Sequence, residues 1–545
     1  MYIQLSKISF LRRFIIPCAI AVLLTGCGAP PQTKPAPSAE QTAETETAAL
    51  TGGDAECTLA DVSKIKVKEF NLGEGELKTL KGFPVPCPLN GIIAVPEGTG
   101  PFPLVIIFQG VYAINDVYKD KICEGYDYLV KQLAAQGYVA MSFNINVEYT
   151  FDYGESVDYG WAYEIYKQHL AKIESSSAGE DAGYGVDLEG KVDTGDLHLM
   201  GHSRGGQIAE VIARREKSEG KNRIHSLFCI APPPMGIFAE PLPDVPTGVV
   251  ISEFDEDVAG SGQKIFDEIQ KTPGRKCPAA IVYLRGANHA FFCRSFARGD
   301  DDRADRLTRE RQEDFTARYI SQFLDVFSKG GAPSGLFDTS VPQPRRMYGY
   351  DVVASYCPPG KVSLLSVTEG NGQVTAKGAE LRYVVQTING KTLFRHPGYP
   401  EELPLYNIRW TDRAGAVSVA PETADFTPYR ALSVYLAVDS SDRLNAPGEP
   451  QALTVALKTR SGAERSVVVP KGIAALSYHP GEKASVKEFD GSVTEYWTGQ
   501  MPLGDLRIPL SFFNAIDLGE VSEISLSLDQ TDSGAIMISG MYLTP

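Results

Sequence analysis

The chain has 545 residues, of which 43% are hydrophobic and 22% are charged, and its formal net charge is −16. This length exceeds what one hydrophobic core supports, so we expect two or three domains. The acidic balance excludes nucleic acid and an anionic membrane surface as main partners, because both require a positive protein surface.

The first 26 residues have the layout of an export signal. Three basic residues precede a short apolar run at 14–24, which is too short to span a bilayer comfortably. The run ends in Leu-Thr-Gly-Cys, which resembles the bacterial lipoprotein box, where the chain is cut before a cysteine that carries the lipid. We therefore expect a lipoprotein signal at 1–26, lipidation of Cys27 and an extracytoplasmic protein held at the bacterial cell membrane, or a secreted one if the cysteine is incidental.

Residues 27–57 are rich in Pro, Ala, Thr and Glu and lack aromatic residues and periodicity. Such a segment cannot bury enough apolar surface to fold, so we predict a disordered tether. Seven cysteines follow Cys27, an odd number, and their spacing is not that of a metal site. We expect no metal and no cofactor.

Residues 58–331 alternate between apolar runs and amphipathic stretches, which predicts a doubly wound, mostly parallel sheet covered by helices. The predicted strands are 91–98, 102–108, 138–146, 196–202, 225–234, 247–254 and 279–289. The predicted helices are 127–137, 161–174, 205–220, 262–271 and a long helix or helix pair at 303–330. Among the aromatic residues after 147, we expect Tyr149 and Tyr153 to line a substrate cleft.

Residues 332–545 change in texture, because helical periodicity gives way to short alternating strands separated by turns. This pattern predicts an all-β sandwich, and its order of strands resembles a jelly-roll module of the carbohydrate-binding type. Such sandwiches bind glycan in some proteins and only pack beside a catalytic domain in others. Both roles stay open at this point.

A nucleophile motif lies at the junction of the strand 196–202 and the helix 205–220. The sequence from Gly201 to Gly205 fits the pattern G-x-S-x-G, in which a strained turn raises the serine above the sheet edge. The simpler alternative is a glycine-rich turn with no chemistry. The strand before it and the helix after it favour Ser203 as a nucleophile.

A nucleophilic serine requires a histidine base, which follows it in the chain order of such a fold. Only His289 lies at the carboxyl end of the last predicted strand of the sheet, where catalytic loops belong. The other six histidines precede Ser203, precede a strand at the wrong edge, or lie in the sandwich: His169, His198, His202, His225, His396 and His479.

The acid that orients the base should follow the strand 247–254. Among Glu253, Asp255, Glu256 and Asp257, the register favours Asp255, with Asp257 as the alternative. The oxyanion hole needs two backbone amides. We expect one from Arg204, after the nucleophile, and one from Val111, after the strand 102–108.

The stretches GHSRGG, FDEDVAGSG and GANHAFF carry a family resemblance. Residues from about 90 to 330 resemble the α/β-hydrolase superfamily, and are closest to secreted bacterial relatives of dienelactone hydrolase and polyester hydrolases. Many of those relatives have His-Gly in the oxyanion loop, where this chain has Gln109-Gly110.

The resemblance implies a serine hydrolase of carboxylesterase type, acting on a small-molecule or polymer ester through an acyl-enzyme. Two alternatives remain at this point. One is a serine peptidase or amidase with the same three residues. The other is a non-catalytic glycan-binding lipoprotein.

Overall fold

The computed structural model describes residues 48–50, 53–112, 114–151, 159–233, 242–296, 304–367, 370, 372–387, 402–487 and 491–545. The predicted signal, Cys27, Tyr153 and His396 lie outside the described residues. No helix within the described ranges is both long and apolar enough to cross a bilayer.

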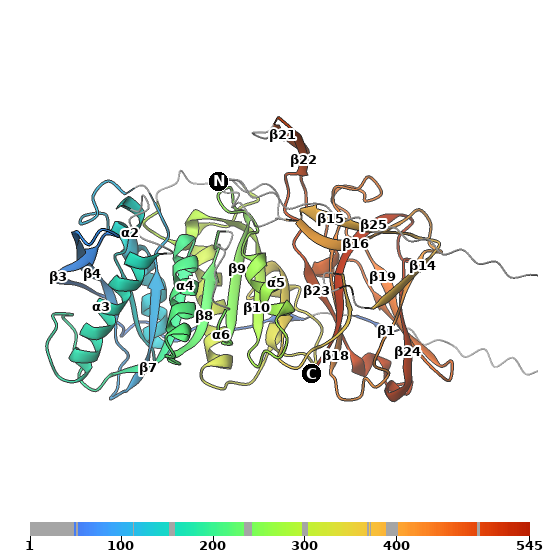
Figure 1. Ribbon diagram of the computed structural model, residues 1–545. Helices are drawn as coiled ribbons and strands as arrows, with labels where there is room; N and C mark the ends of the chain where they lie inside the picture. Colours follow the sequence, from blue (N-terminus) through green and yellow to red (C-terminus); the bar gives the residue numbers. More distant parts are fainter. Residues whose placement is uncertain are drawn as a thin grey trace, which may run out of the picture. The chain divides into compact units, whose positions relative to one another are not determined.

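Within the described residues, an eleven-stranded sheet forms the first region (Figure 1). Its centre is parallel, as predicted, and runs through β6 (Val139–Phe143), β5 (Phe102–Phe108), β7 (Val192–His202), β8 (Ile224–Ile230), β9 (Thr247–Phe254) and β10 (Ala279–Asn288). The antiparallel strands β4 (Pro84–Ala94) and β3 (Lys68–Lys78) extend one edge. The other edge continues through β12 (Tyr350–Cys357), β11 (Arg346–Met347) and β2 (Asp54–Ala55).

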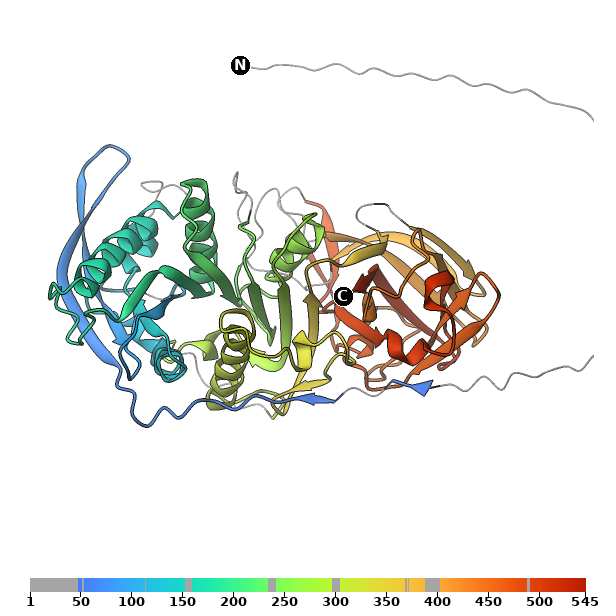
Figure 2. The same cartoon turned by 90° about the horizontal axis from the view of Figure 1, so that it is seen from below.

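Helices cover both faces of this sheet, and β5 shows how the sequence divides them. Its residues Leu104, Ile106 and Phe108 face one hydrophobic cluster, and Val105 and Ile107 face the other. The first cluster holds α3 (Gly160–Ser177), α4 (Arg204–Ser218) and α5 (Gln263–Lys271). The second holds α1 (Asp127–Ala135) and α6 (Arg309–Phe327), on the opposite side of the sheet in Figure 2.

The start of α6 differs from the sequence prediction. Residues 304–308 are not helical, and the Thr308 hydroxyl accepts a hydrogen bond from the Arg311 amide. This capping contact fixes the first turn, so the helix begins at Arg309 rather than at 303. Two shorter helices matter for the site: the 3₁₀ helix η1 (Ile122–Tyr126) and α2 (Asn146–Phe151).

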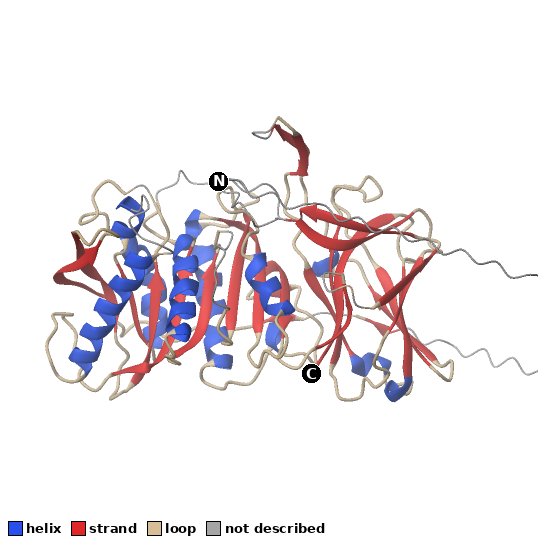
Figure 3. Cartoon of the chain, viewed as in Figure 1, coloured by secondary structure: helices blue, strands red, loops and turns tan. Residues whose placement is uncertain are grey.

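The second region is built of strands (Figure 3). One sheet contains β1 (Ala48–Ala49), β20 (Glu464–Val469), β19 (Leu453–Thr459), β24 (Val521–Ser527), β17 (Ala416–Ala420) and β14 (Gln373–Lys377). The other contains β15 (Glu380–Thr387), β16 (Glu402–Trp410), β25 (Gly534–Thr544), β18 (Ala431–Val438) and β23 (Gly504–Pro509), with β13 (Val362–Ser366) beside β25. A hydrophobic cluster fills the space between them. The all-β class is confirmed, and jelly-roll connectivity stays a prediction.

Two domain boundaries differ from those expected at 57 and 332. Strand β12 pairs with β10 of the first region, so the sandwich begins at β13. Strand β12 lies in the part of the chain assigned to the sandwich, but it covers an otherwise open edge of the first sheet. Inside the expected tether, β1 pairs with β20, and Leu50 is 1% exposed in the sandwich core. The apolar run 48–50 is therefore part of the fold.

Candidate active site

Ser203 stands at a sharp turn between the end of β7 and the start of α4. Its φ of 54° and ψ of −131° are strained for a residue with a side chain. The Ser203 amide donates to the Ile230 carbonyl, and the Gly206 amide donates to the Ser203 carbonyl, both at 2.8 Å. This turn places Ser203 at the carboxyl edge of the parallel strands.

The glycines on either side of Ser203 are required by close backbone contacts. A Cβ at Gly201 would collide with the Gly205 carbonyl, and a Cβ at Gly205 would collide with the Phe108 carbonyl at the end of β5. A Cβ at Gly110 would lie 2.9 Å from the Ser203 Cβ. The loop after β5 therefore packs directly against the serine.

His289 and Asp255 meet at the same edge of the sheet. The distance from Nδ1 of His289 to Oδ2 of Asp255 is 2.8 Å, and both residues are buried. The Ser252 hydroxyl also donates to Oδ2, at 3.0 Å. Because a carboxylate oxygen accepts this bond, Nδ1 of His289 donates it, and Nε2 is the ring nitrogen that can accept a proton.

The structure also separates the two candidate acids. Oδ1 of Asp255 accepts the amides of Asp257 and Val258, at 3.0 and 2.8 Å, so the carboxylate is held on both oxygens. Asp257 lies on the other side of the imidazole, with its carboxylate 3.5 Å from Nε2 of His289, and its side chain is 30% exposed. Asp255 has the geometry of an orienting acid, and Asp257 does not.

The loop after β5 is fixed by three side chains. The Gln109 amide donates to Oδ1 of Asn146 at 2.6 Å, and the Tyr149 hydroxyl donates to the Gln109 carbonyl at 2.7 Å. The Gly110 amide donates to the Tyr126 hydroxyl at 3.2 Å. The Gln109 side chain is therefore held by Asn146. The Tyr149 hydroxyl holds the backbone of the same loop, which carries Val111.

Tyr126 connects this loop to the turn at Ser203 and to the loop that carries His289. Its hydroxyl lies 3.0 Å from Nδ1 of His202, and Nε2 of His202 lies 2.9 Å from the His289 carbonyl. An amide always donates and a carbonyl always accepts, so the ends of this chain fix its direction. Tyr126 accepts from Gly110 and donates to Nδ1 of His202, and His202 donates from Nε2 to His289.

This chain requires a neutral His202. Burial, followed by the charge of His289, lowers the pKa of His202 well below its usual value, and burial raises the pKa of Tyr126 well above its usual value. Both groups therefore keep their protons in place near neutral pH. The sequence indicated no role for Tyr126, because only the tertiary fold brings η1 against the elbow.

The remaining described histidines serve elsewhere. His169 stacks on Phe143 in the core, and His198 contacts the Ser226 hydroxyl at 2.8 Å. His225 lies 2.7 Å from Asp196, near the amino ends of β7 and β8. His479 is buried in the sandwich.

Residues 89–320 match the family model described as the dienelactone hydrolase family. This stretch is a dienelactone hydrolase family domain of the α/β-hydrolase superfamily. The domain runs from β4 into α6 and contains the elbow, the acid loop and His289. It is therefore a hydrolase domain. No curated protein shows significant sequence similarity to the chain.

Proposed function

We propose that the protein is a serine-dependent carboxylic ester hydrolase that acts outside the cytoplasm. The observation that carries this proposal is the 2.8 Å bond from His289 to Asp255 at the edge where the elbow presents Ser203. A serine hydroxyl is a weak nucleophile that needs a base, and the base needs a third group to orient it. The hydrolase family of the domain supports the same chemistry.

The proposed reaction has two halves. Ser203 bonds to the ester carbonyl carbon while Nε2 of His289 takes the hydroxyl proton, and Asp255 stabilises the resulting imidazolium. The amides of Val111 and Arg204 donate to the oxyanion. His289 then gives its proton to the leaving alcohol. Water, activated by the same histidine, cleaves the acyl-enzyme.

Labelling and turnover test this proposal together. We expect a fluorophosphonate probe to label Ser203, and we expect the Ser203→Ala variant to lose p-nitrophenyl acetate turnover by more than about ten-thousand-fold without a change in melting temperature. Unchanged turnover in that variant would overturn the proposal. Hydrolysis of a p-nitroanilide in preference to the ester indicates a peptidase or amidase. An intact protein that neither labels nor turns over substrate is a binding protein.

The extracytoplasmic location is a separate part of the proposal. It rests on the apolar run 14–24, which Cys27 follows closely, and on the Pro- and Thr-rich segment after Cys27. We expect the wild-type protein to incorporate labelled fatty acid and to partition into detergent. The Cys27→Ala variant should do neither, and lipid incorporation by that variant would exclude Cys27 as the modified residue.

A further inference from the structure

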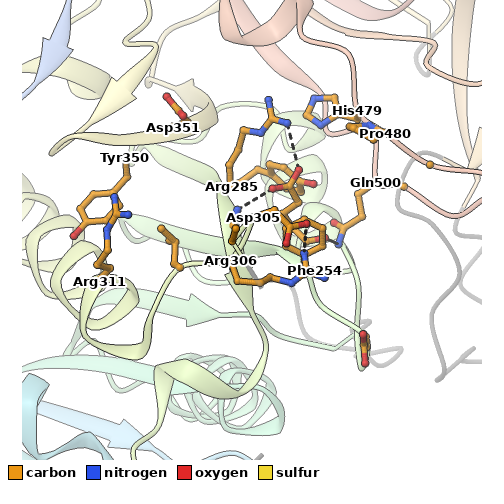
Figure 4. Close-up of a pocket in the computed structure, with 18 of the residues that line it drawn as sticks. Phe254, Arg285, Asp305, Arg306, Arg311, Tyr350, Asp351, His479, Pro480 and Gln500 are labelled. Atoms are coloured by element: carbon orange, nitrogen blue, oxygen red, sulfur yellow. Dashed lines mark hydrogen bonds and ion pairs between the residues drawn. The ribbon is translucent and has the colours of Figure 1, made fainter. Parts of the chain in front are cut away.

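A large cavity of about 1090 Å³ lies where the hydrolase domain meets the sandwich (Figure 4). Its lining residues come from five segments: Glu253–Glu256, Tyr283–Gly286, Ala304–Arg311, Arg346–Asp351 and, in the sandwich, His479–Gln500. Ser203, Asp255 and His289 are not among these lining residues. Asp255 nevertheless lies between Phe254 and Glu256, which both line the cavity. The segment Glu253–Glu256 therefore lies between the candidate triad and this cavity.

The sandwich contributes two buried polar side chains to the wall. Gln500 is 6% exposed, and its Nε2 donates to the carbonyls of Ser252 and Glu253, both at 3.0 Å. His479 is 3% exposed, and burial lowers its pKa to about 3, so the ring is neutral. Among the described residues, Oε1 of Gln500 and Nδ1 of His479 have no hydrogen-bond partner. A buried polar atom without a partner is costly, and these two lie in the wall of a cavity, where a bound ligand can supply the missing hydrogen bonds.

The charges of the wall are balanced against one another. Each guanidinium lies beside a carboxylate or over an aromatic ring: Arg285 beside Glu253, Arg346 beside Asp351, Arg306 over Phe254 and Arg311 over Tyr350. Counting Glu256, Asp305 and Glu482, the lining residues hold one more carboxylate than guanidiniums. An anionic ligand would therefore meet no excess positive charge. At Glu253, Asp351 and Asp305, a cation would have to displace the guanidinium that lies beside the carboxylate.

We propose that this cavity binds an uncharged oligosaccharide, which is the glycan part of a glycan ester. Sugar hydroxyls donate and accept at once, so they bridge neighbouring carboxylates and guanidiniums without breaking either pair. The volume is at the upper end of small-molecule sites, which suits several linked sugars better than one. The ester assignment rests on the proposed function, and the oligosaccharide site does not.

The surroundings of the cavity suit an extended ligand. A hairpin is formed by β21 (Lys483–Lys487) and β22 (Val493–Trp497). The residues on either side of it, Glu482 and Thr498, line the cavity. Figure 1 shows this hairpin projecting from the same side of the molecule as the start of α4, where the elbow lies. A polymer held along the hairpin and the cavity would thus lie on the catalytic side.

Calorimetric titration of the full chain tests the proposal. The Ser203→Ala variant, which separates binding from turnover, is titrated with uncharged gluco-, xylo- and manno-oligosaccharides from dimer to hexamer, and with galacturonate oligomers as the acidic counterpart. We expect at least one uncharged series to bind, with affinity rising with length. Adding Arg285→Ala should weaken that binding by about ten- to a hundred-fold, because charge-assisted hydrogen bonds are lost. The matched control, Arg413→Ala, removes an exposed arginine that pairs with Asp532 outside the cavity, and should bind as before.

Four outcomes overturn the site: no binding of any uncharged oligosaccharide, tighter binding of the acidic series, equal binding by the Arg285→Ala variant, or an equal loss in the Arg413→Ala variant. If Arg285→Ala lowers the melting temperature, the exposed cavity residue Glu482 replaces it, and Glu482→Ala should weaken binding. Wild-type turnover of p-nitrophenyl acetate without oligosaccharide binding overturns this site and leaves the esterase proposal standing. Oligosaccharide binding without ester turnover supports this site and overturns the esterase proposal.

Discussion

The candidate catalytic edge, formed by Ser203, Asp255 and His289, and the cavity lie on either side of the segment Glu253–Glu256, and their polar groups differ in hydrogen bonding. At the catalytic edge, the Asp255 carboxylate accepts hydrogen bonds from Ser252, His289 and two backbone amides. In the cavity wall, Gln500 and His479 each keep a buried polar atom without a partner among the described residues. The first arrangement is organised before any substrate arrives, as electrostatic catalysis requires. The second is completed only by what binds there.

The largest effect is expected from changing the acid of the catalytic edge. In Asp255→Asn, the amide can donate to Nδ1 of His289, which favours the imidazole tautomer with its proton on Nε2. That nitrogen can then no longer accept the Ser203 proton, so we expect kcat for p-nitrophenyl acetate to fall by about ten-thousand-fold. The melting temperature should change little, because the side chain keeps its shape.

Asp257→Asn is the matched control for that substitution. Asp257 is half-buried and its carboxylate lies 3.5 Å from Nε2 of His289, farther than Asp255 lies from Nδ1, so we expect less than about a fivefold change in kcat. Equal losses in the two variants would contradict the assignment of Asp255.

The next effect concerns stability at acid pH and compares the His479 imidazole in the cavity wall with the His169 imidazole in a closed core, where neither ring nitrogen has a hydrogen-bond partner among the described residues. Burial lowers the pKa of both His479 and His169 to about 3. The unfolded chain takes up these protons as pH falls below about 6.5, whereas the folded protein stays neutral until about pH 3. Stability is therefore full above pH 6.5 and falls below it, by about 2–3 kcal/mol per histidine at pH 4.5.

Replacing His169 tests this assignment, because its ring stacks on Phe143 at 4.3 Å between centroids and a phenylalanine preserves that contact. We expect His169→Phe to reduce the loss of melting temperature between pH 7 and pH 4.5. His225→Phe, which changes a half-exposed histidine, should not. Identical pH profiles for wild type and His169→Phe would show that burial does not keep this ring neutral.

The hydrogen-bond chain of the catalytic edge should give a smaller effect. Tyr126→Phe removes the acceptor of the Gly110 amide and the donor to His202, so the oxyanion loop loses its link to the elbow. We expect kcat to fall by about ten- to a hundred-fold with KM little changed, since the loss concerns the transition state. Tyr128→Phe is the control: its hydroxyl donates to the Phe292 carbonyl outside this chain, and its kcat should stay near that of wild type. A rise in KM alone in Tyr126→Phe would indicate a binding role instead.

The candidate catalytic edge and the cavity differ in how far the sequence predicts them. Ser203, Asp255 and His289 each follow a buried strand, so local pattern and chain order suffice to propose them together. Tyr126 has no such pattern, because its role depends on where η1 packs. The cavity joins residues from Glu253 to Gln500, which no spacing connects. Strand β12 follows the end of the helical periodicity in the chain, and only the open edge beside β10 determines that it joins the first sheet.

The smallest effect is expected at Gln500, which lines the cavity and donates hydrogen bonds to the strand that precedes Asp255. The Gln500 amide supplies hydrogen bonds to the Ser252 and Glu253 carbonyls where the pairing of β9 with β10 is irregular. Gln500→Leu leaves these carbonyls, which precede Asp255 by three and two residues, without that donor, while it removes the unpartnered Oε1. Because the two changes oppose each other in stability, we expect a small shift in melting temperature and a two- to fivefold loss of kcat, roughly half a kcal/mol or more in the barrier.

Gln136→Leu is the control for Gln500→Leu, because the Gln136 side-chain amide also donates to a carbonyl, that of Ser321. This bond joins the end of α1 to α6, away from the candidate catalytic edge and the cavity. Gln136→Leu should lower stability and leave kcat unchanged. If kcat falls in Gln500→Leu alone, the sandwich helps to hold the acid loop. A ligand in the cavity could then change kcat by changing the hydrogen bonds of the Gln500 side chain. If neither variant loses kcat, the catalytic edge keeps its geometry without the sandwich, and the loop insulates one region from the other.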